Sequence, residues 1–244
     1  VHIPPSPGDA GSAVGAAQYL YHIYHKNPKN VSDSTQLINE NVYVGPSFSN
    51  EEITNFLDSK NISYERLDDE LLLKKTAQLI ADGNIVGWYQ GKMEWGPRAL
   101  GNRSILADPR RADMKDILNA KIKHRESFRP FAPSILEEHT SEYFEIDIPS
   151  PYMLMVSPVK KPKEIPAVTH VDGTGRVQTV SKQSNPLYYN LINEFYKITK
   201  VPVIINTSMN VMGEPIVNTP EQAYSMIVKT DMDCIVMGNN LVIK

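Results

Sequence analysis

The segment DDELLLKKTAQLIADGNIVGWYQG, residues 68–91, decides which class of fold the sequence predicts. Its acidic start and the glycine after its last apolar turn are typical of a helix over residues 68–82 that ends at Gly83. The apolar run 85–89 then indicates a buried strand, which leads directly into Gln90 and Gly91. A helix, a glycine stop, a strand and a glycine-rich loop in this order favour an α/β domain, in which ligands gather where strands end.

A basic segment, residues 90–133, follows this strand. Between Lys92 and Arg129 it carries ten Lys or Arg and five Asp or Glu, a net charge near +5, whereas the whole 244-residue chain has a net charge of −3. A basic island in an acidic protein indicates a focused anion site rather than general binding to polyanions. The segment is also expected to contain a helix over residues 112–122.

The arginines of the basic segment allow two interpretations. A guanidinium group binds phosphate through two parallel hydrogen bonds, and nearby glycines let backbone amides approach the same oxygens. The alternative is a charged face in contact with solvent. Arg98 and Arg103 alternate with apolar residues that prefer burial, and a buried arginine needs an anionic partner, which favours the phosphate site. The candidate residues are Arg98, Arg103, Lys123, Arg125 and Arg129.

Two later stretches place polar side chains at predicted strand ends. Segments 167–171 and 176–180 alternate with a period of two around a glycine-containing turn, which predicts a hairpin that carries His170, Asp172 and Arg176. His170 is a candidate proton donor, a hydrogen-bonding group or an ordinary strand residue. A strand over 201–205 is expected to end in Asn206, Thr207, Ser208 and Asn210, which either line a site or close a turn.

Other elements follow from local signals. Helices are expected over residues 49–59, 137–144 and 185–200 and after Thr219, strands over 131–136 and 153–157, and a final hairpin at 238–240. Near the start, Asp9 is expected to cap a helix that runs to about residue 25 and has a nearly bare face of small residues. The polar stretch 27–35 is a candidate domain boundary.

Several functional classes receive no support from the sequence. No run of about 18 apolar residues and no signal-peptide pattern occurs, so we expect no membrane contact and a cytoplasmic location. The single cysteine, Cys234, lies in an apolar run, which argues against an internal disulfide or a cysteine metal site. No phosphate-binding P-loop and no GxGxxG motif is present. Because the chain opens at Val1 without a methionine, we expect it to be a piece of a longer protein.

Four motifs stand out: Glu94-x-Gly-Pro-Arg-Ala-Leu-Gly-Asn-Arg-Ser104, Lys123-x-Arg-Glu-x-Phe-Arg-Pro-Phe-Ala-Pro133, His170-Val-Asp-Gly-Thr-x-Arg-Val-Gln-Thr179 and Asn206-Thr-Ser-x-Asn210. Taken together, these motifs resemble the C-terminal half of the O-carbamoyltransferases, the family of nodulation protein NodU and antibiotic-tailoring carbamoyltransferases. They occur in order over nearly the whole chain and are highly specific. Three positions depart from the family pattern: Gly175 replaces alanine, Met209 replaces phenylalanine and Lys200 replaces glycine.

The resemblance implies a fold and a division into domains. Residues 31–244 would form a YrdC-like domain, an α/β twisted mixed sheet with flanking helices. Residues 1–30 would be the last part of an N-terminal domain with the fold of threonylcarbamoyl-transferases and actin-like ATPases. The YrdC-like domain would convert carbamoyl phosphate and ATP, bound with Mg²⁺, into carbamoyl-adenylate. The N-terminal domain, missing here, would then transfer the carbamoyl group to the hydroxyl of an acceptor.

The resemblance also implies residue roles. Arg98, Lys123, Arg129 and Arg176 would bind carbamoyl phosphate and the phosphates of ATP, the first three as catalytic residues, and Asn206 and Ser208 would line the same pocket. Asp9 matches a metal-binding aspartate of the N-terminal domain, whose transition metal needs histidine partners that are absent from this chain. Further substrate-binding or nucleotide-binding candidates are Gly101, Asn102, Arg103, Arg125, His170 and Asn210.

Three rival interpretations remain at this point. A threonylcarbamoyl-adenylate synthase would use threonine and bicarbonate in place of carbamoyl phosphate, although it would not need the Asp9 helix. An RNA-binding module would use the basic segment, but few aromatic residues accompany it, and nucleic-acid binding is not expected. A structural fragment would have no activity until the missing domain closes its pocket.

Overall fold

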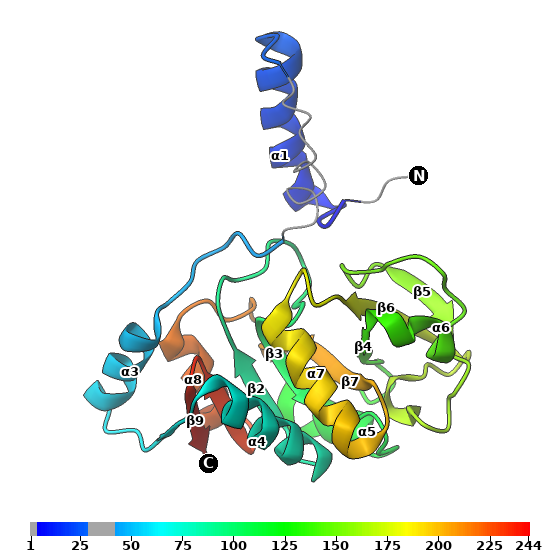
Figure 1. The fold of residues 1–244 in the computed structure, drawn as a ribbon. Coiled ribbons are helices and arrows are strands. Elements are labelled where there is room, and N and C mark those ends of the chain that lie inside the picture. Colours follow the sequence, from blue (N-terminus) through cyan, green and yellow to red (C-terminus); the bar gives the residue numbers. More distant parts are fainter. Residues whose placement is uncertain (1–3, 29–41) are drawn as a thin grey trace.

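The computed structural model describes residues 4–28 and 42–244, and within them nine strands form one twisted mixed sheet (Figure 1). The order across the sheet is β1-β9-β8-β2-β3-β7-β4-β6-β5. β2 pairs with β8 and β4 with β6 in parallel, and all other neighbours are antiparallel. The strand bounds are β1 Glu65–Arg66, β2 Val86–Tyr89, β3 Arg103–Ala107, β4 Ala132–Leu136, β5 Met155–Pro158, β6 Thr174–Val180, β7 Val203–Ser208, β8 Cys234–Met237 and β9 Asn240–Ile243.

Helices cover both faces of the sheet, because alternate strand residues point to opposite sides. In β7, Ile204 packs into the core beneath α4 (Asp69–Ala81) and α7 (Pro186–Thr199), whereas Val203 and Ile205 pack into the core on the other side. α4 and α7 lie next to each other in front of the sheet in Figure 1. The other face is covered by α3 (Asn50–Ser59), α5 (Met114–Ile117) and α8 (Pro220–Lys229). The predicted α/β class is therefore confirmed.

The helix starts were predictable because each depends on a local capping group. The side chains of Ser49 and Thr219 each complete a capping box, and the Asn185 side chain accepts the amide of Tyr188. The helix expected over 112–122 is present as α5 followed by a π-helical stretch, η2 (Leu118–Lys123). Short helices η3 (Glu137–His139) and α6 (Thr140–Tyr143) fill the stretch expected at 137–144.

Two strand predictions were wrong in their pairing or extent. Residues 167–171 do not form the first strand of a hairpin: Pro166–Val168 is a 3₁₀ turn, η4, and β6 pairs with β5 and β4 instead. Asn206 to Ser208 belong to β7 itself rather than to a loop after it. Strand β3, which was not predicted, lies between β2 and β7 in the middle of the sheet. Each difference reflects pairing between distant segments, which a local pattern does not encode.

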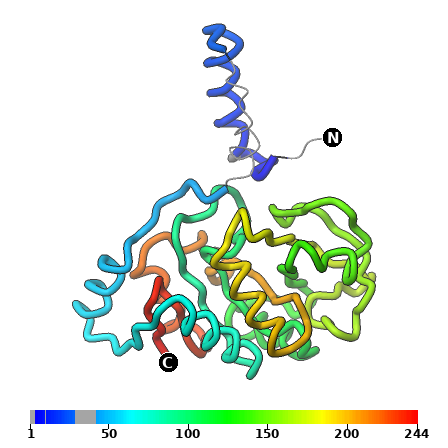
Figure 2. Tube along the Cα trace, in the orientation of Figure 1, coloured from blue at the N-terminus to red at the C-terminus, as the bar shows by residue number. Residues whose placement is uncertain are grey.

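The first helix stands apart from the sheet. α1 (Asp9–Gln18) continues into η1 (Tyr19–Tyr24), and both project from the rest of the chain (Figure 2). The N-cap is Gly8 and makes no side-chain cap bond, so the prediction that Asp9 caps this helix was wrong: Asp9 is its first residue. Most of the predicted connector 27–35 lies outside the described residues. No helix within residues 4–28 and 42–244 is long and apolar enough to cross a bilayer.

Candidate anion-binding site

The loop between β2 and β3 is organised by the buried carboxylate of Glu94. One oxygen, Oε1, accepts the backbone amides of Leu100 at 2.6 Å, Asn102 at 2.7 Å and Arg103 at 3.2 Å. Burial raises the pKa of Glu94, and the amide hydrogen bonds oppose that shift. Gly101 takes a φ of +109°, and its α-carbon lies against the ring of Tyr188. These contacts fix the path of the chain on both sides of Arg98.

A small cavity lies where this loop meets β7, β6 and the chain before β4. Its volume is about 90 Å³, and three of its lining residues are arginines: Arg98 from the β2–β3 loop, Arg125 after η2, and Arg176 on β6. The other lining residues are apolar or neutral, among them Asn206 and Ser208 of β7. None of the lining residues in the described part of the chain carries a carboxylate. The three guanidinium groups come from segments more than 20 residues apart, so only the tertiary fold brings them together.

The charges of these arginines are not neutralised by the protein. Within the described part of the chain none of the three forms an ion pair, and the Nε atoms of Arg98 and Arg176 are buried without a hydrogen-bond partner. Burial, together with the positive charges of Arg98 and Arg125, lowers the pKa of Arg176 to about 10. Positively charged groups with buried, unpartnered hydrogen-bond donors form a site at which a bound anion would supply the missing acceptors.

Lys123 lies beside this cavity and is held by Ser208 and Asn210. Its Nζ donates to the carbonyl and the hydroxyl oxygen of Ser208 and to the carbonyl and side-chain oxygens of Asn210, the last two at 3.0 and 2.9 Å. All four acceptors are uncharged. Burial first, and then the charge of Arg125, lowers the pKa of Lys123 to about 7. The predicted Lys123, Arg125, Ser208 and Asn210 therefore form one connected group.

Other predicted residues lie outside this group. Arg103 is fully buried, and its guanidinium donates to the carbonyls of Gln90 at 2.5 Å and Gly91 at 3.1 Å, among others, while it stacks over Tyr89 at 3.9 Å. Backbone carbonyls accept from this guanidinium, and although burial lowers its pKa, the negative charge of Glu94 acts to raise it, so the burial of Arg103 does not require a phosphate ligand. The Asn102 side chain donates to the Lys92 carbonyl and accepts from another buried amide side chain.

Arg129 and His170 also do not line the cavity. Arg129 is half exposed and forms an ion pair with Glu126 at 3.0 Å. His170 lies in the turn before β6, with Nδ1 3.1 Å from the Thr174 hydroxyl, and burial lowers its pKa. The nearby charge of Arg176 acts in the same direction. Ligand binding by these two residues stays a prediction.

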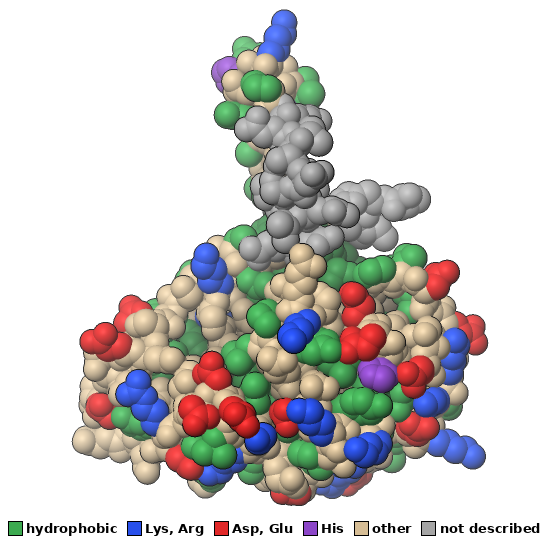
Figure 3. All heavy atoms as spheres, viewed as in Figure 1, with side chains coloured by type: hydrophobic (Ala, Val, Ile, Leu, Met, Phe, Trp, Pro, Cys, Tyr) green, Lys and Arg blue, Asp and Glu red, His purple; other side chains and the backbone are tan. Residues whose placement is uncertain are grey.

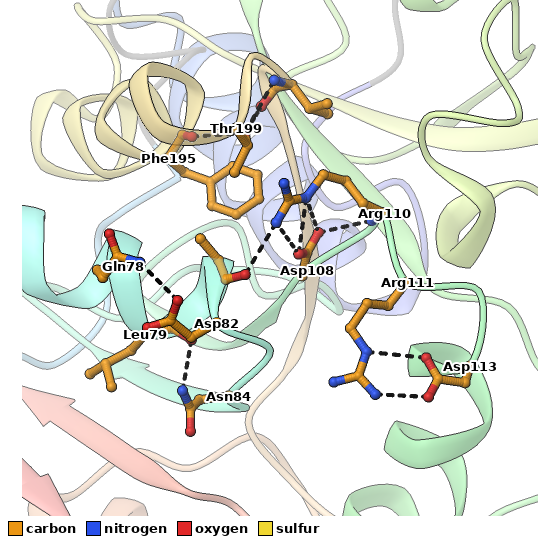
Figure 4. Close-up of polar contacts among 12 residues, drawn as sticks. Gln78, Leu79, Asp82, Asn84, Asp108, Arg110, Arg111, Asp113, Phe195 and Thr199 are labelled. Carbon is orange, nitrogen blue, oxygen red and sulfur yellow. Dashed lines mark hydrogen bonds and ion pairs between the residues drawn. The ribbon is translucent and has the colours of Figure 1, made fainter.

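Arg110 and Arg111, also in the basic segment, have structural partners (Figure 4). Arg110 forms a forked ion pair with Asp108, with its shortest contact at 2.6 Å, and donates to the Ala81 carbonyl at the end of α4. Arg111 pairs with Asp113 at 2.8 Å. Figure 3 shows acidic and basic side chains interspersed on the face that carries α4 and α7. Only part of the basic segment therefore contributes uncompensated charge.

Gln178 is the main residue that the sequence analysis missed. It is buried on β6, accepts from the Ser134 hydroxyl at 2.6 Å and the Asn206 amide at 2.8 Å, and donates to the Leu100 carbonyl at 2.9 Å. Gln178 lies two residues after Arg176, so both point to the same side of the strand. Since side chains alternate along a strand, the candidate role of Arg176 could have pointed to Gln178 from the sequence alone.

Comparison with known proteins gives a family match over most of the chain. The family model described as Carbamoyltransferase C-terminus matches residues 77–244. Nodulation protein NolO of Bradyrhizobium diazoefficiens is 43% identical over 253 residues, covering 100% of this chain and 44% of NolO. The 3'-hydroxymethylcephem-O-carbamoyltransferase of Amycolatopsis lactamdurans is 37% identical over 218 residues, 89% of this chain and 39% of that protein. The chain thus spans less than half the length of these relatives.

Among solved structures, Sua5 of P. abyssi, complexed with L-threonine, has a similar fold. The TM-score is 0.52 at 19% sequence identity, and the match covers 72% of this chain and 48% of Sua5. This confirms the predicted kind of sheet. The predicted remnant of an actin-like domain is not shown by any of these similarities.

Proposed function

The chain belongs to the carbamoyltransferase C-terminus family, and on that premise we propose that it binds carbamoyl phosphate and ATP and forms carbamoyl-adenylate. In the longer protein, the segment before it would transfer the carbamoyl group to a hydroxyl-bearing acceptor. The exposed apolar side chains of η1, Tyr19, Leu20, Tyr21, Ile23 and Tyr24, support packing against that segment. A need for ATP fits a cytoplasmic location.

One observation carries the proposal: three arginines surround a cavity that no carboxylate within residues 4–28 and 42–244 lines. A buried positive charge is costly unless it is paired, so the site is poised for an anion with several oxygens. At about 90 Å³ the cavity is smaller than the roughly 300–1,000 Å³ that hold drug-sized ligands. It therefore suits one phosphoryl or carbamoyl phosphate group, and the adenosine of ATP would extend outside it.

The proposed reaction has two steps. Water releases inorganic phosphate from carbamoyl phosphate and leaves carbamate. A carbamate oxygen then attacks the α-phosphorus of ATP, the bond between that phosphorus and the bridging oxygen breaks, and pyrophosphate leaves. Negative charge grows on phosphate oxygens, so Arg98, Arg125, Arg176 and Lys123 would act by positioning and by electrostatic stabilisation. The first step also releases one proton from water, whereas the second needs no general base because the attacking carbamate oxygen is already an anion.

Metal ions would enter in two separate ways. Within residues 4–28 and 42–244 no three His, Cys, Asp or Glu side chains cluster as a metal site would require. Mg²⁺ would therefore be held mainly by the phosphates of ATP and by water, as is common for this ion. A transition metal at Asp9 would depend on ligands from the longer protein.

Pyrophosphate exchange tests the proposal. Incorporation of labelled pyrophosphate into ATP should depend on carbamoyl phosphate, and the Arg98→Ala substitution should abolish it. Exchange that needs threonine and bicarbonate instead would favour a threonylcarbamoyl-adenylate synthase. Failure to bind either ATP or carbamoyl phosphate would overturn the proposal.

A further inference from the structure

The amide group of Asn206 has an orientation that two backbone carbonyls determine. Gln178 Nε2 donates to the Leu100 carbonyl at 2.9 Å, so the other end of that amide, Oε1, faces Ser134 and Asn206. Asn206 must then present its Nδ2 to Gln178, at 2.8 Å, and the same nitrogen donates to the Ala99 carbonyl at 3.2 Å. Turning the Asn206 amide over would place an oxygen against two other oxygens.

This orientation leaves Asn206 Oδ1 as a buried acceptor without a partner. Asn206 is 1% exposed, and Oδ1 has no hydrogen bond. The residue lines the same cavity as Arg98 and Arg176, whose Nε donors are also buried and unpartnered. The residues that line this cavity thus include two arginines with an unused charged donor and one asparagine with an unused acceptor. A ligand that offers only acceptors or a methyl group beside its phosphate would complete the donors and leave Oδ1 without a partner.

We propose that Asn206 Oδ1 selects ligands that carry an N–H donor next to their phosphate group, and so distinguishes carbamoyl phosphate from acyl phosphates of the same size. This inference rests on the proposed function and adds a specificity determinant to it. The carbamoyl NH₂ donates to Oδ1 while the arginines hold the phosphoryl oxygens. Acetyl phosphate has the same charge, but a methyl group replaces the NH₂ and leaves Oδ1 unpaired.

Titration calorimetry of the 244-residue chain with carbamoyl phosphate, acetyl phosphate and inorganic phosphate tests this assignment. An unpaired buried acceptor typically costs enough free energy to weaken binding by about tenfold or more. The unsubstituted protein should therefore bind carbamoyl phosphate at least about tenfold more tightly than acetyl phosphate. In Asn206→Ala the two affinities should become equal to within about twofold, with inorganic phosphate still bound.

Ser134→Ala is the matched control, because it removes one hydrogen bond to Gln178 and leaves both amide orientations fixed. It should preserve the preference for carbamoyl phosphate. Equal affinities in the unsubstituted protein, a preference that survives in folded Asn206→Ala, or an equal loss in Ser134→Ala would each overturn the inference while the proposed function stands. If none of the three ligands binds, the proposed function itself fails. Circular dichroism reports whether each variant is folded.

Discussion

Lys123 and Ser208 lie 85 residues apart in the sequence, and Lys123 Nζ donates to both the carbonyl and the hydroxyl oxygen of Ser208. This link joins the end of η2 to the end of β7. Asn210 supplies the remaining acceptors, and no carboxylate among the described residues forms an ion pair with Lys123, so the lysine is buried without a counter-charge from them. A buried, positively charged ammonium group of this kind favours anion binding, and its charge depends on pH.

The first prediction concerns the pH dependence of anion binding. In the free protein the pKa of Lys123 is lowered to about 7, and a bound anion should raise it because it stabilises the charged form. Affinity for sulfate, which does not titrate near neutral pH, should therefore be highest below pH 7 and fall as the pH rises through 7. The decline should reach up to about tenfold per pH unit, the limit for one linked proton.

Calorimetry between pH 6 and 9 measures this decline. Lys123→Met should bind sulfate more weakly and lose the pH dependence, whereas Lys121→Met, a change at an exposed position of the same helix, should keep it. An affinity that stays constant over this range in the unsubstituted protein would mean that Lys123 keeps its proton throughout.

The second prediction separates two arginines of the basic segment. Arg98→Ala should weaken phosphate binding by about tenfold to a hundredfold, because a hydrogen bond to a charged group contributes about 1.5–3 kcal/mol. Arg111→Ala removes the same charge from an exposed ion pair outside the cavity and should change the affinity by less than about twofold. Fluorescence competition or calorimetry at constant ionic strength is suitable. Similar losses in both variants would point to general electrostatics instead of a site.

Arg129 provides a related test of the predicted catalytic set. Its ion pair with Glu126 holds it at the surface, so binding would require it to turn toward the cavity. Arg129→Ala should slow pyrophosphate exchange if that movement occurs. A variant with unchanged exchange and unchanged nucleotide binding would remove Arg129 from the set.

The third prediction concerns Gly101, whose φ is +109° and whose added Cβ would lie 2.3 Å from the Tyr188 ring. Gly101→Ala should lower the free energy of unfolding by about 3 kcal/mol or more, since backbone strain and overpacking each cost about 1–3 kcal/mol. Gly173→Ala shares a positive φ but meets open space, and should cost about 1–2 kcal/mol. Urea unfolding compares the two, and equal costs would show that Tyr188 moves aside.

The fourth prediction concerns Glu94. Glu94→Ala removes the acceptor of three buried backbone amides and should lower the free energy of unfolding by about 3 kcal/mol, with a parallel loss of phosphate binding because the loop carries Arg98. Glu94→Gln keeps one oxygen in place and should cost about 1 kcal/mol. Urea unfolding and calorimetry measure both effects. Full phosphate affinity in a folded Glu94→Ala protein would show that the loop holds its shape without this carboxylate.

Predictions from the sequence were accurate where the signal was local. The caps at Ser49, Asn185 and Thr219 each involve groups within three residues, so the helices they start were placed correctly. Strand β3 was missed because its flanks, Arg103 at one end and Asp108 beyond the other, resemble a loop. It becomes a strand through pairing with β2 and β7. The hairpin predicted over 167–180 was the converse error: its local pattern indicated a strand pair, but β6 pairs with the distant strands β4 and β5.

The sequence by itself determined the composition of the candidate site, since the motifs around Arg98, Lys123, Arg176 and Asn206 were recognisable from residue order alone. Only the tertiary structure decided which arginine charges remain uncompensated. Arg103 is surrounded by carbonyls and Arg110 is paired with Asp108, whereas Arg98, Arg125 and Arg176 meet at one cavity that no acid of the described residues lines. The physical reason is that the electrostatic state of a buried charge depends on the groups within a few ångströms of it, and long-range strand pairing selects those groups.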